Sequence, residues 1–228
     1  VPTTDLLSKV LSPEGVGYYC IVGLSQQEKV PPKQSFHATL AEAEQKIDEL
    51  LQEKRNVYFA CAKFKDPKEG RTQPNGDFIK AFWIDVDCGL GKPYADQAEG
   101  LSALKTFCAK VHLPLPTIVN SGRGIHAYWR LKEVITRKDW KPVAERLKEL
   151  CEEHEFFADP SRTADNASIL RVPETLNFKD EEGLPVELLA VEPEVEYEAI
   201  KSKIGVLIAP DWVKKQLDEV TKALLGNK

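Results

Sequence analysis

The chain alternates between stretches whose apolar residues recur every three or four positions and shorter runs of aromatic and β-branched residues. The first pattern predicts amphipathic helices, and it occurs at 4–11, 40–53, 95–111 and 136–153. The second predicts strands, and it occurs at 17–23, 56–64, 78–87, 117–121, 125–131, 155–159 and 185–191. Helices and strands mixed in this order, with one antiparallel hairpin, favour an α+β fold over a doubly wound α/β fold.

Polar residues mark where several of these elements begin. Thr39 followed by Glu42 forms a capping box at the start of the second helix. The stretch 65–77, rich in proline, glycine and charge, predicts a mobile loop. Asp165 predicts the N-cap of a short helix near 165–170.

Length and composition fit one large domain. The 228 residues carry a net charge of −5, and no apolar run approaches the ~20 residues that span a bilayer. We expect a single cytoplasmic domain over 1–228, with an N-terminal lobe at 1–54, a core at about 55–190 and a peripheral helical segment at 192–228. Because the chain starts at Val1 and contains no Met, we also expect it to be a piece of a longer protein.

Charge and cysteine usage argue against two classes of protein. The negative balance disfavours a surface built for nonspecific nucleic-acid binding, although it allows a local basic groove. The five cysteines are odd in number and form no CxxC pair, so a disulfide framework is not expected. Cys88, Cys108, His112 and Cys151 could still meet in space, which leaves a structural zinc site as an alternative.

The first candidate for chemistry is the stretch FWIDVDCG at 82–89. Asp85 and Asp87 end an apolar run with one residue between them, so in a strand their side chains share one face of the sheet. Two carboxylates this close, beside Trp83 and Ile84, repel each other unless something compensates. A divalent cation held by oxygen ligands would compensate, and the alternative is a pair of aspartates at a sheet edge or turn.

A second candidate is the stretch NSGRGIH in the predicted hairpin. Its two glycines let the backbone approach a ligand and turn its amides toward an anion, while the serine, arginine and histidine add donors. The stretch is either a phosphate cradle or a tight hairpin with a solvated arginine and a core histidine. It is not a P-loop, because no GK[ST] follows and no helix opens there. The candidate residues are Ser121, Gly122, Arg123, Gly124 and His126.

Two further segments carry charged residues. Asp159 ends the run EFFAD and could complete a triad of metal ligands, with Asp165 as its competitor. The loop RVPETLNFK places Arg171, Asn177 and Lys179 near a rigid proline, and its alternative interpretation is a solvated turn. Acids that hold Mg²⁺ or Mn²⁺, together with cations that neutralise phosphates, fit a nucleoside triphosphate as ligand.

In this order the motifs resemble the archaeo-eukaryotic primase superfamily, and most of all the primase-polymerases of phages, plasmids and mobile elements. The motifs D-x-D, S-G-x-G-x-H, a hydrophobic pair with Asp, and R-x-P-x-T-x-N-x-K occupy about residues 55 to 190. The resemblance implies a compact α+β core with an RRM-like mixed or antiparallel sheet, a small N-terminal α/β lobe and a C-terminal helix. It also implies a bacterial, archaeal or phage-infected cell.

The resemblance implies a role for each motif residue. Asp85, Asp87 and Asp159 match the catalytic acids that bind two Mg²⁺ or Mn²⁺ ions. The implied reaction makes a primer or DNA strand on a single-stranded template from dNTPs or NTPs, with a helicase or accessory primase domain as a partner in the full-length protein. Residues expected on the incoming nucleotide are Ser121, His126, Arg171 and Lys179.

Two points concern the surroundings of these motifs. Relatives often read Pro-Gly-Thr where this chain has Glu174, whose carboxylate either weakens phosphate binding or faces solvent. Basic residues on or beside the 65–77 loop are candidates for contacts with the template, although a charged loop can also be merely solvated. These residues are Lys63, Lys65, Lys68, Arg71 and Lys80.

Other functions remain open at this stage. A glycosyltransferase can use an apolar strand ending in D-x-D to hold a metal and a nucleotide sugar. A noncatalytic module can bind single strands on an RRM-like sheet, although such modules carry exposed aromatic residues where this strand carries acids. A nuclease is also possible in principle, because carboxylate-metal sites hydrolyse phosphodiesters.

Overall fold

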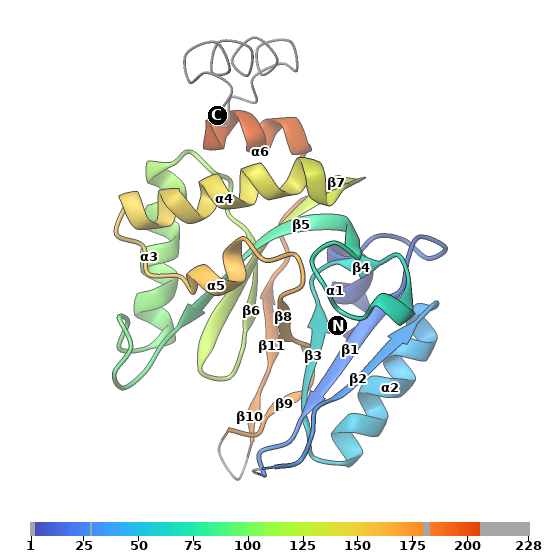
Figure 1. The fold of residues 1–228 in the computed structure, drawn as a ribbon. Helices are drawn as coiled ribbons and strands as arrows, with labels where there is room; N and C mark the ends of the chain where they lie inside the picture. The colour runs from blue at the N-terminus through green and yellow to red at the C-terminus, as the bar shows by residue number, and fades with distance from the viewer. Residues whose placement is uncertain (1–2, 28, 180–182, 206–228) are drawn as a thin grey trace, which may run out of the picture.

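The computed structural model describes residues 3–27, 29–179 and 183–205. Figure 1 shows the elements in chain order. The helices are α1 (Thr3–Val10), α2 (Leu40–Gln52), the 3₁₀ helix η1 (Pro67–Glu69), α3 (Gln97–Lys110), α4 (Arg137–Glu153), α5 (Pro160–Thr163) and α6 (Tyr197–Ile204). The strands are β1 (Tyr19–Leu24), β2 (Lys33–His37), β3 (Asn56–Ala60), β4 (Lys63–Phe64), β5 (Gly76–Asp87), β6 (Thr117–Asn120), β7 (Gly124–Ile135), β8 (Ile169–Arg171), β9 (Leu176–Asn177), β10 (Leu184–Pro185) and β11 (Glu187–Ala190).

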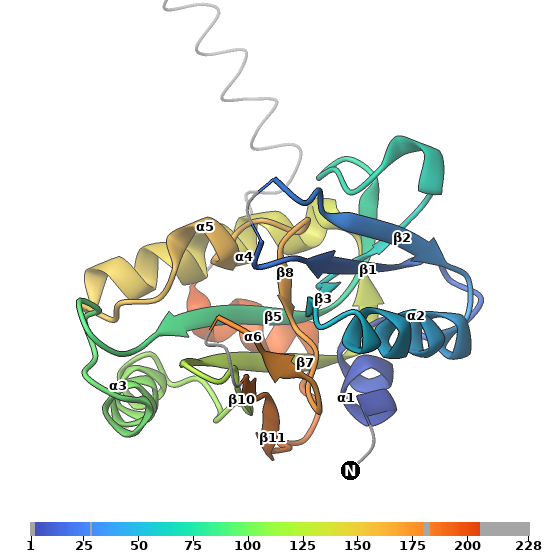
Figure 2. The same ribbon diagram turned by 90° about the horizontal axis from the view of Figure 1, so that it is seen from below.

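Two antiparallel sheets form the frame of the protein. One has the strand order β2–β1–β3–β8, and the other has the order β11–β6–β7–β5–β4. Helix α2 packs on the first sheet, while α4 and α5 lie on one side of the second sheet and α3 on the other (Figure 2). This mixed arrangement confirms the predicted α+β class. Within the described residues, no helix is both long and apolar enough to cross a membrane.

One apolar core joins the two sheets. Phe59 of β3 and Tyr128 of β7 stack across the gap between them, with ring centroids 6.3 Å apart. Trp83 of β5 stacks on Trp140 of α4 at 4.8 Å, which fixes the long helix against the strand that carries the D-x-D motif. Strands β3 and β8 lie beyond residue 54 yet complete the sheet of the N-terminal lobe, so this sheet draws on both predicted parts of the chain.

Local sequence signals account for the best-predicted elements. The Thr39 hydroxyl accepts a hydrogen bond from Glu42 N at 3.2 Å, and the Glu42 carboxylate accepts one from Thr39 N at 3.1 Å. The predicted capping box at the start of α2 is therefore confirmed. The predicted hairpin is also present as β6 and β7, and β7 pairs along its length with β5.

The structure corrects three predicted elements. The run 155–159 forms no strand: Glu155 lies in a turn with a φ of +52°, and the amides of Phe157 and Asp159 donate to the Tyr94 hydroxyl and to Asp85 O instead of a strand ladder. The short helix lies at 160–163 rather than near 165–170, since an aspartate followed by proline starts a helix well. The strand predicted at 56–64 breaks after β3, and its last two residues pair with β5 as β4.

Two further differences concern β2 and the end of the chain. The polar run KQSFH gave no strand signal, yet it forms β2 along the edge of the four-stranded sheet. Of the peripheral helical segment expected at 192–228, residues 197–204 form α6, and residues 206–228 lie outside the described residues. All five cysteines are buried with free thiols.

Lys63 does not lie on the surface. Its side chain is buried, its ammonium donates to Pro13 O at 3.0 Å, and it sits 3.9 Å from the centroid of the Tyr19 ring. Burial lowers the pKa of its ammonium to about 8, although the charge of Glu14 opposes this change. The expectation that Lys63 contacts the template is therefore wrong, because no strand can reach a buried ammonium.

Replacing Lys63 by Met should make stability less dependent on alkaline pH. Because the pKa of Lys63 is lower in the folded chain, the unfolded chain binds more protons between pH 8 and about pH 10, so wild-type stability rises with pH there. We expect the wild type to gain about 2–3 kcal/mol relative to Lys63→Met between pH 7 and pH 10. Urea unfolding at both pH values measures this gain. Lys65→Met, at an exposed lysine, is the control, and parallel pH profiles for Lys63→Met and wild type would contradict the prediction.

Candidate active site

Asp85 and Asp87 lie at the end of β5, as predicted. They pair across the β5–β7 ladder with His126 and Gly124, so Asp85 and His126 face the same side of the sheet. The Asp85 side chain is largely buried, whereas that of Asp87 is 53% exposed. The two acids therefore sit at the point where the core ends and solvent begins.

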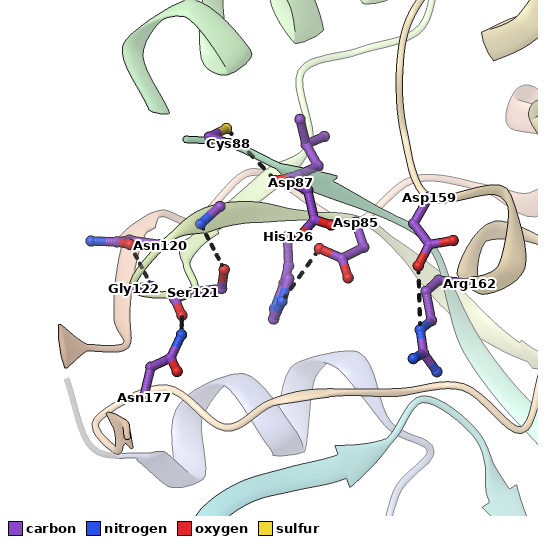
Figure 3. Close-up of polar contacts among 12 residues, drawn as sticks. Asp85, Asp87, Cys88, Asn120, Ser121, Gly122, His126, Asp159, Arg162 and Asn177 are labelled. Carbon is purple, nitrogen blue, oxygen red and sulfur yellow. Dashed lines mark hydrogen bonds and ion pairs between the residues drawn. The ribbon is translucent and has the colours of Figure 1, made fainter. Parts of the chain in front are cut away.

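Asp159 reaches the same place from a distant part of the chain. Its backbone N–H donates to Asp85 O at 2.7 Å, and Trp83 Nε1 donates to Arg162 O at 2.9 Å. These two bonds fix the segment before and through α5 on top of β5. Figure 3 shows Asp85 between His126 on one side and Asp159 on the other.

The three acids line one pocket with four cations. The pocket has a volume of about 200 Å³. Its acids come from β5 and the start of α5, and its cations come from the β6–β7 turn, α5, β8 and the loop after β9. The charged residues in its wall are Asp85, Asp87, Asp159, Arg123, Arg162, Arg171 and Lys179.

Each acid has a different neighbour. The Asp87 carboxylate pairs with the Lys92 ammonium at 2.6 Å, and the Asp159 carboxylate lies 3.6 Å from Arg162 Nε. Asp159 also caps α5, because its Oδ1 accepts from Ser161 N at 2.8 Å. Among the described residues, no three His, Cys, Asp or Glu side chains are arranged to hold a metal ion, which also leaves the zinc alternative without support.

Asp85 is the acid of the site whose pKa is raised by burial and by its neighbours. Burial, followed by the charges of Asp87 and Asp159, raises its pKa to about 7 against the opposing effect of Arg162 and Lys179. No lysine or arginine of the described chain lies within 4 Å of its carboxylate. Its nearest basic side chain in the described residues is the imidazole of His126, whose Nε2 lies 3.8 Å from Asp85 Oδ1.

His126 is neutral, so it cannot supply a positive charge to a ligand. Burial, together with the nearby charge of Arg171, lowers its pKa to about 3. Its Nδ1 lies 3.4 Å from the Tyr128 hydroxyl. A contact between His126 and a phosphate would therefore be a hydrogen bond rather than an ion pair.

The glycines of the hairpin serve packing as well as any ligand. A Cβ on Gly124 would lie 2.3 Å from Val86 O, so only glycine lets β7 pair closely with β5 here. Gly122 has a φ of +90° and lies against Asn177, where a Cβ would also clash. Ser121 Oγ accepts a hydrogen bond from Gly124 N at 3.1 Å, which closes the turn and leaves the hydroxyl hydrogen for another partner.

The loop from β8 to β9 is held to both sheets. Arg171 is buried, donates to Asn56 Oδ1 at 2.7 Å and lies 4.7 Å from the centroid of the Tyr58 ring. Asn177 donates to Ser121 O at 2.9 Å and accepts from Lys179 N at 3.1 Å. Asn177 thus braces the loop against the hairpin, while Lys179 remains exposed at the pocket.

Glu174, at the position where relatives often have glycine, adopts a backbone conformation that favours glycine. Its φ is +62°, in the left-handed region that glycine adopts without cost. The residue is exposed and is not part of the pocket wall, and its N–H donates to Val186 O at 2.7 Å. Glutamate at this position therefore strains the backbone slightly without placing a carboxylate in the pocket.

The remaining template candidates differ in exposure. Lys65 and Lys68 are exposed, and Arg71 reaches across to Gln34 of β2 at 3.2 Å. The Lys80 ammonium pairs with Glu194 and is only 14% exposed, so a strand would have to displace this pair. Contact of Lys65, Lys68, Arg71 and Lys80 with a template remains a prediction.

Three residues in or beside the pocket escaped the sequence analysis. Arg162 could have been found, because Asp-Pro-Ser-Arg starts a helix and brings the fourth residue back over the first. Lys92 follows a turn with two glycines, which gives no sign that it returns to Asp87. Tyr58 was placed in a strand, but which face of that strand meets the pocket depends on the pairing of β3 with β8.

The fold is similar to that of solved primase structures. The AEP domain of the primase-polymerase of cyanophage S-2L matches with a TM-score of 0.67 and 14% identity, over 89% of this chain and 96% of that one. Primase RepB′ matches with a TM-score of 0.58 and 15% identity, over 97% and 67%. Its catalytic domain in complex with initiator DNA matches with a TM-score of 0.55 and 14% identity, over 96% and 97%. No family model matches the sequence, and no curated protein matches it.

These identities are low, so the likeness shows the fold alone. The predicted resemblance to primase-polymerases is confirmed for the fold, including its antiparallel sheets and flanking helices. The roles of the individual site residues remain predictions.

Replacing Asp85 by Asn should stabilise the protein in the absence of divalent cations. The amide keeps the shape of the carboxylate but removes a buried charge that two neighbouring acids repel. We expect the free energy of unfolding in EDTA at pH 8 to rise by about 1–3 kcal/mol. Urea unfolding measures the change. Asp87→Asn, at an exposed position, should change it by less than about 0.5 kcal/mol, and a loss of stability in Asp85→Asn would show that repulsion is not the main effect.

Proposed function

We propose that the chain transfers nucleotides, beginning or extending a strand on a single-stranded DNA template from deoxynucleoside or nucleoside triphosphates. The observation that carries the proposal is one pocket in which three aspartates meet four basic side chains. The pocket lies in a fold similar to that of a primase-polymerase domain and of the catalytic domain of primase RepB′, and the latter was solved in complex with initiator DNA. The same likeness favours this function over a glycosyltransferase.

We propose Mg²⁺ or Mn²⁺ in a two-metal site held by Asp85, Asp87 and Asp159. Carboxylate oxygens are the ligands these ions prefer, and the uncompensated charge on Asp85 suits a cation. In the described structure the three carboxylates are not arranged around a common point where a metal ion could bind. The Asp87 carboxylate also forms an ion pair with the Lys92 ammonium. Metal binding would therefore require Asp87 to leave Lys92. Bound ions would supply stabilisation of the charge that develops on the reacting phosphate.

The cations of the pocket suit the triphosphate. Arg123 and Lys179 line both this pocket and an adjoining cavity of about 450 Å³, so they can contact a chain of phosphates along its length. Arg171 is fixed by Asn56 and therefore contributes a positive charge at a constant position. Ser121 offers a hydroxyl hydrogen, and neutral His126 offers one ring hydrogen bond.

The proposed reaction is an in-line displacement at the α-phosphorus. A 3′-oxygen forms a bond to this phosphorus while the bond to the oxygen bridging the α- and β-phosphates breaks. Pyrophosphate leaves with the electron pair, and the proton of the 3′-hydroxyl passes to solvent. The protein contributes mainly position and charge: the acids fix the reacting end, and Arg123, Arg171 and Lys179 hold the leaving group.

One observation supports a noncatalytic nucleotide- or DNA-binding module as a second candidate. Asp87 and Asp159 are already paired with Lys92 and Arg162, and the acids are not arranged around a common point. A protein that only binds would keep these pairs and would not need a metal.

Incorporation of labelled nucleotides on primed and unprimed single-stranded templates decides between the two candidates. With Mg²⁺ or Mn²⁺, the wild type should form products that fall by more than about a thousandfold in Asp85→Ala/Asp87→Ala. Asp48→Ala, at an exposed acid on α2, is the control and should match the wild type. Products without a primer identify a primase. Binding of template without products under any condition would reject the catalytic proposal and favour the module.

Lys179→Ala should weaken the binding of the nucleoside triphosphate. Removal of one charge from the leaving-group side should raise the KM for the nucleotide by about tenfold, with a smaller effect on the KM for the template. Steady-state kinetics at fixed salt measure both constants. Lys110→Ala, at an exposed lysine at the end of α3, is the matched control. An unchanged nucleotide KM in Lys179→Ala would remove this residue from the triphosphate site.

A further inference from the structure

Another cavity, distinct from the two already described, lies beside the pocket and shares two of its acids. It has a volume of about 600 Å³, within the range of cavities that bind small organic ligands. It lies between the C-terminal end of α4, the run before α5 and the loop after β5. Its wall includes Asp87, Asp159, Lys92, Lys148, Phe156 and Phe157.

Phe157 presents an aromatic ring at this cavity. Its side chain is 56% exposed, whereas its neighbour Phe156 is buried in the core. The backbone is held in place, because Phe157 N donates to the Tyr94 hydroxyl at 2.9 Å. The ring of Phe157 also meets the Tyr94 ring edge-on, with centroids 6.2 Å apart. An exposed aromatic ring on a fixed backbone is a stacking platform for a nucleobase.

The charges of this cavity differ from those of the first pocket. Glu152 and Glu155 add to the two shared acids, and the described part of the chain contributes two basic residues to its wall, Lys92 and Lys148. Lys92 is already paired with Asp87. A triphosphate is repelled by such a wall, while an uncharged base and sugar fit its apolar surface. The first pocket, with four cations, offers the opposite environment.

An in-line displacement needs the attacking and leaving groups on opposite sides of the phosphorus. Asp87 and Asp159 line both cavities, so they stand between the cationic pocket and the apolar one. The cationic side suits the leaving pyrophosphate, which assigns the apolar side to the attacking group.

We propose that the apolar cavity binds the 3′-terminal nucleoside that supplies the attacking hydroxyl, and that Phe157 stacks on its base. This inference rests on the proposed function and names the second substrate site of the same reaction. Phe157 is then a positioning residue: it makes no bond to the reacting atoms, but it sets where the 3′-oxygen lies relative to Asp87 and Asp159. The step itself is the displacement already described, with the same bonds formed and broken.

The test uses a primer–template with 2-aminopurine at the 3′ end of the primer, whose fluorescence falls when the base stacks on an aromatic ring. Titration in EDTA measures binding of the primer end without any reaction, and extension with a divalent cation measures the KM for primer and for nucleotide. The variants are Phe157→Ala and Phe157→Trp. Leu189→Ala is the control, because Leu189 is also 56% exposed but lines no wall of either cavity.

Loss of the stack should remove the quenching in Phe157→Ala and raise the KM for primer by about ten- to a hundredfold, with the nucleotide KM unchanged. Phe157→Trp should retain the quenching and the wild-type KM for primer. If the wild type extends the primer and Phe157→Ala leaves the KM for primer unchanged, the inference is overturned. The proposed function would remain intact in that case.

If the wild type forms no product with any metal, the quenching shows whether the nucleoside site or only the proposed catalysis has failed. Phe157-dependent quenching would then support the nucleoside site in a protein that does not polymerise. Absence of quenching in the wild type would overturn the inference independently of catalysis. Thermal unfolding of each variant confirms that the exposed substitution leaves the fold intact.

Discussion

The hydrogen bond from Asp159 N to Asp85 O, 2.7 Å long, is the contact on which the candidate site depends. It connects the end of β5 to the segment that begins α5, far along the chain. A second hydrogen bond, from Trp83 Nε1 to Arg162 O, connects the same strand to α5 about one helical turn later. Without these bonds Asp159 would only cap a four-residue helix. With them, its carboxylate lies in one pocket with Asp85 and Asp87.

The gathering of three acids in one pocket suits the proposed function but lowers the stability of the folded chain. Three acids gathered at the edge of a core raise the energy of the folded chain unless each charge is compensated. Lys92 compensates Asp87, and Arg162 with the first turn of α5 compensates Asp159. Among the residues that the structure describes, Asp85 has no such partner, and its raised pKa reflects this cost. A site built for stability alone would hold an apolar residue or an amide there, so the retained charge favours a ligand that is positive.

The sequence predicted what depends on neighbours in the chain and missed what depends on distant contacts. The apolar run into Asp85 and Asp87 determines β5 and the shared face of the two acids. Lys63, by contrast, is buried only because carbonyl oxygens near Pro13 and the ring of Tyr19 close over it. The glycine at 124 was ascribed to ligand binding, although the structure shows that it also allows close packing against Val86 O. Such packing depends on strand register, which a single sequence does not reveal.

The contrast between the two cavities also bears on how a strand would advance. Under the proposed assignment, the cationic pocket would hold the new nucleotide by its phosphates during addition. After pyrophosphate leaves, the attraction of Arg123 and Lys179 falls, because most of the negative charge has gone with the product. The remaining base and sugar then match the apolar wall around Phe157 better than the cationic wall. Under the proposed assignment, the loss of charge in the reaction itself favours movement of the new 3′ end across Asp87 into the position from which it attacks next.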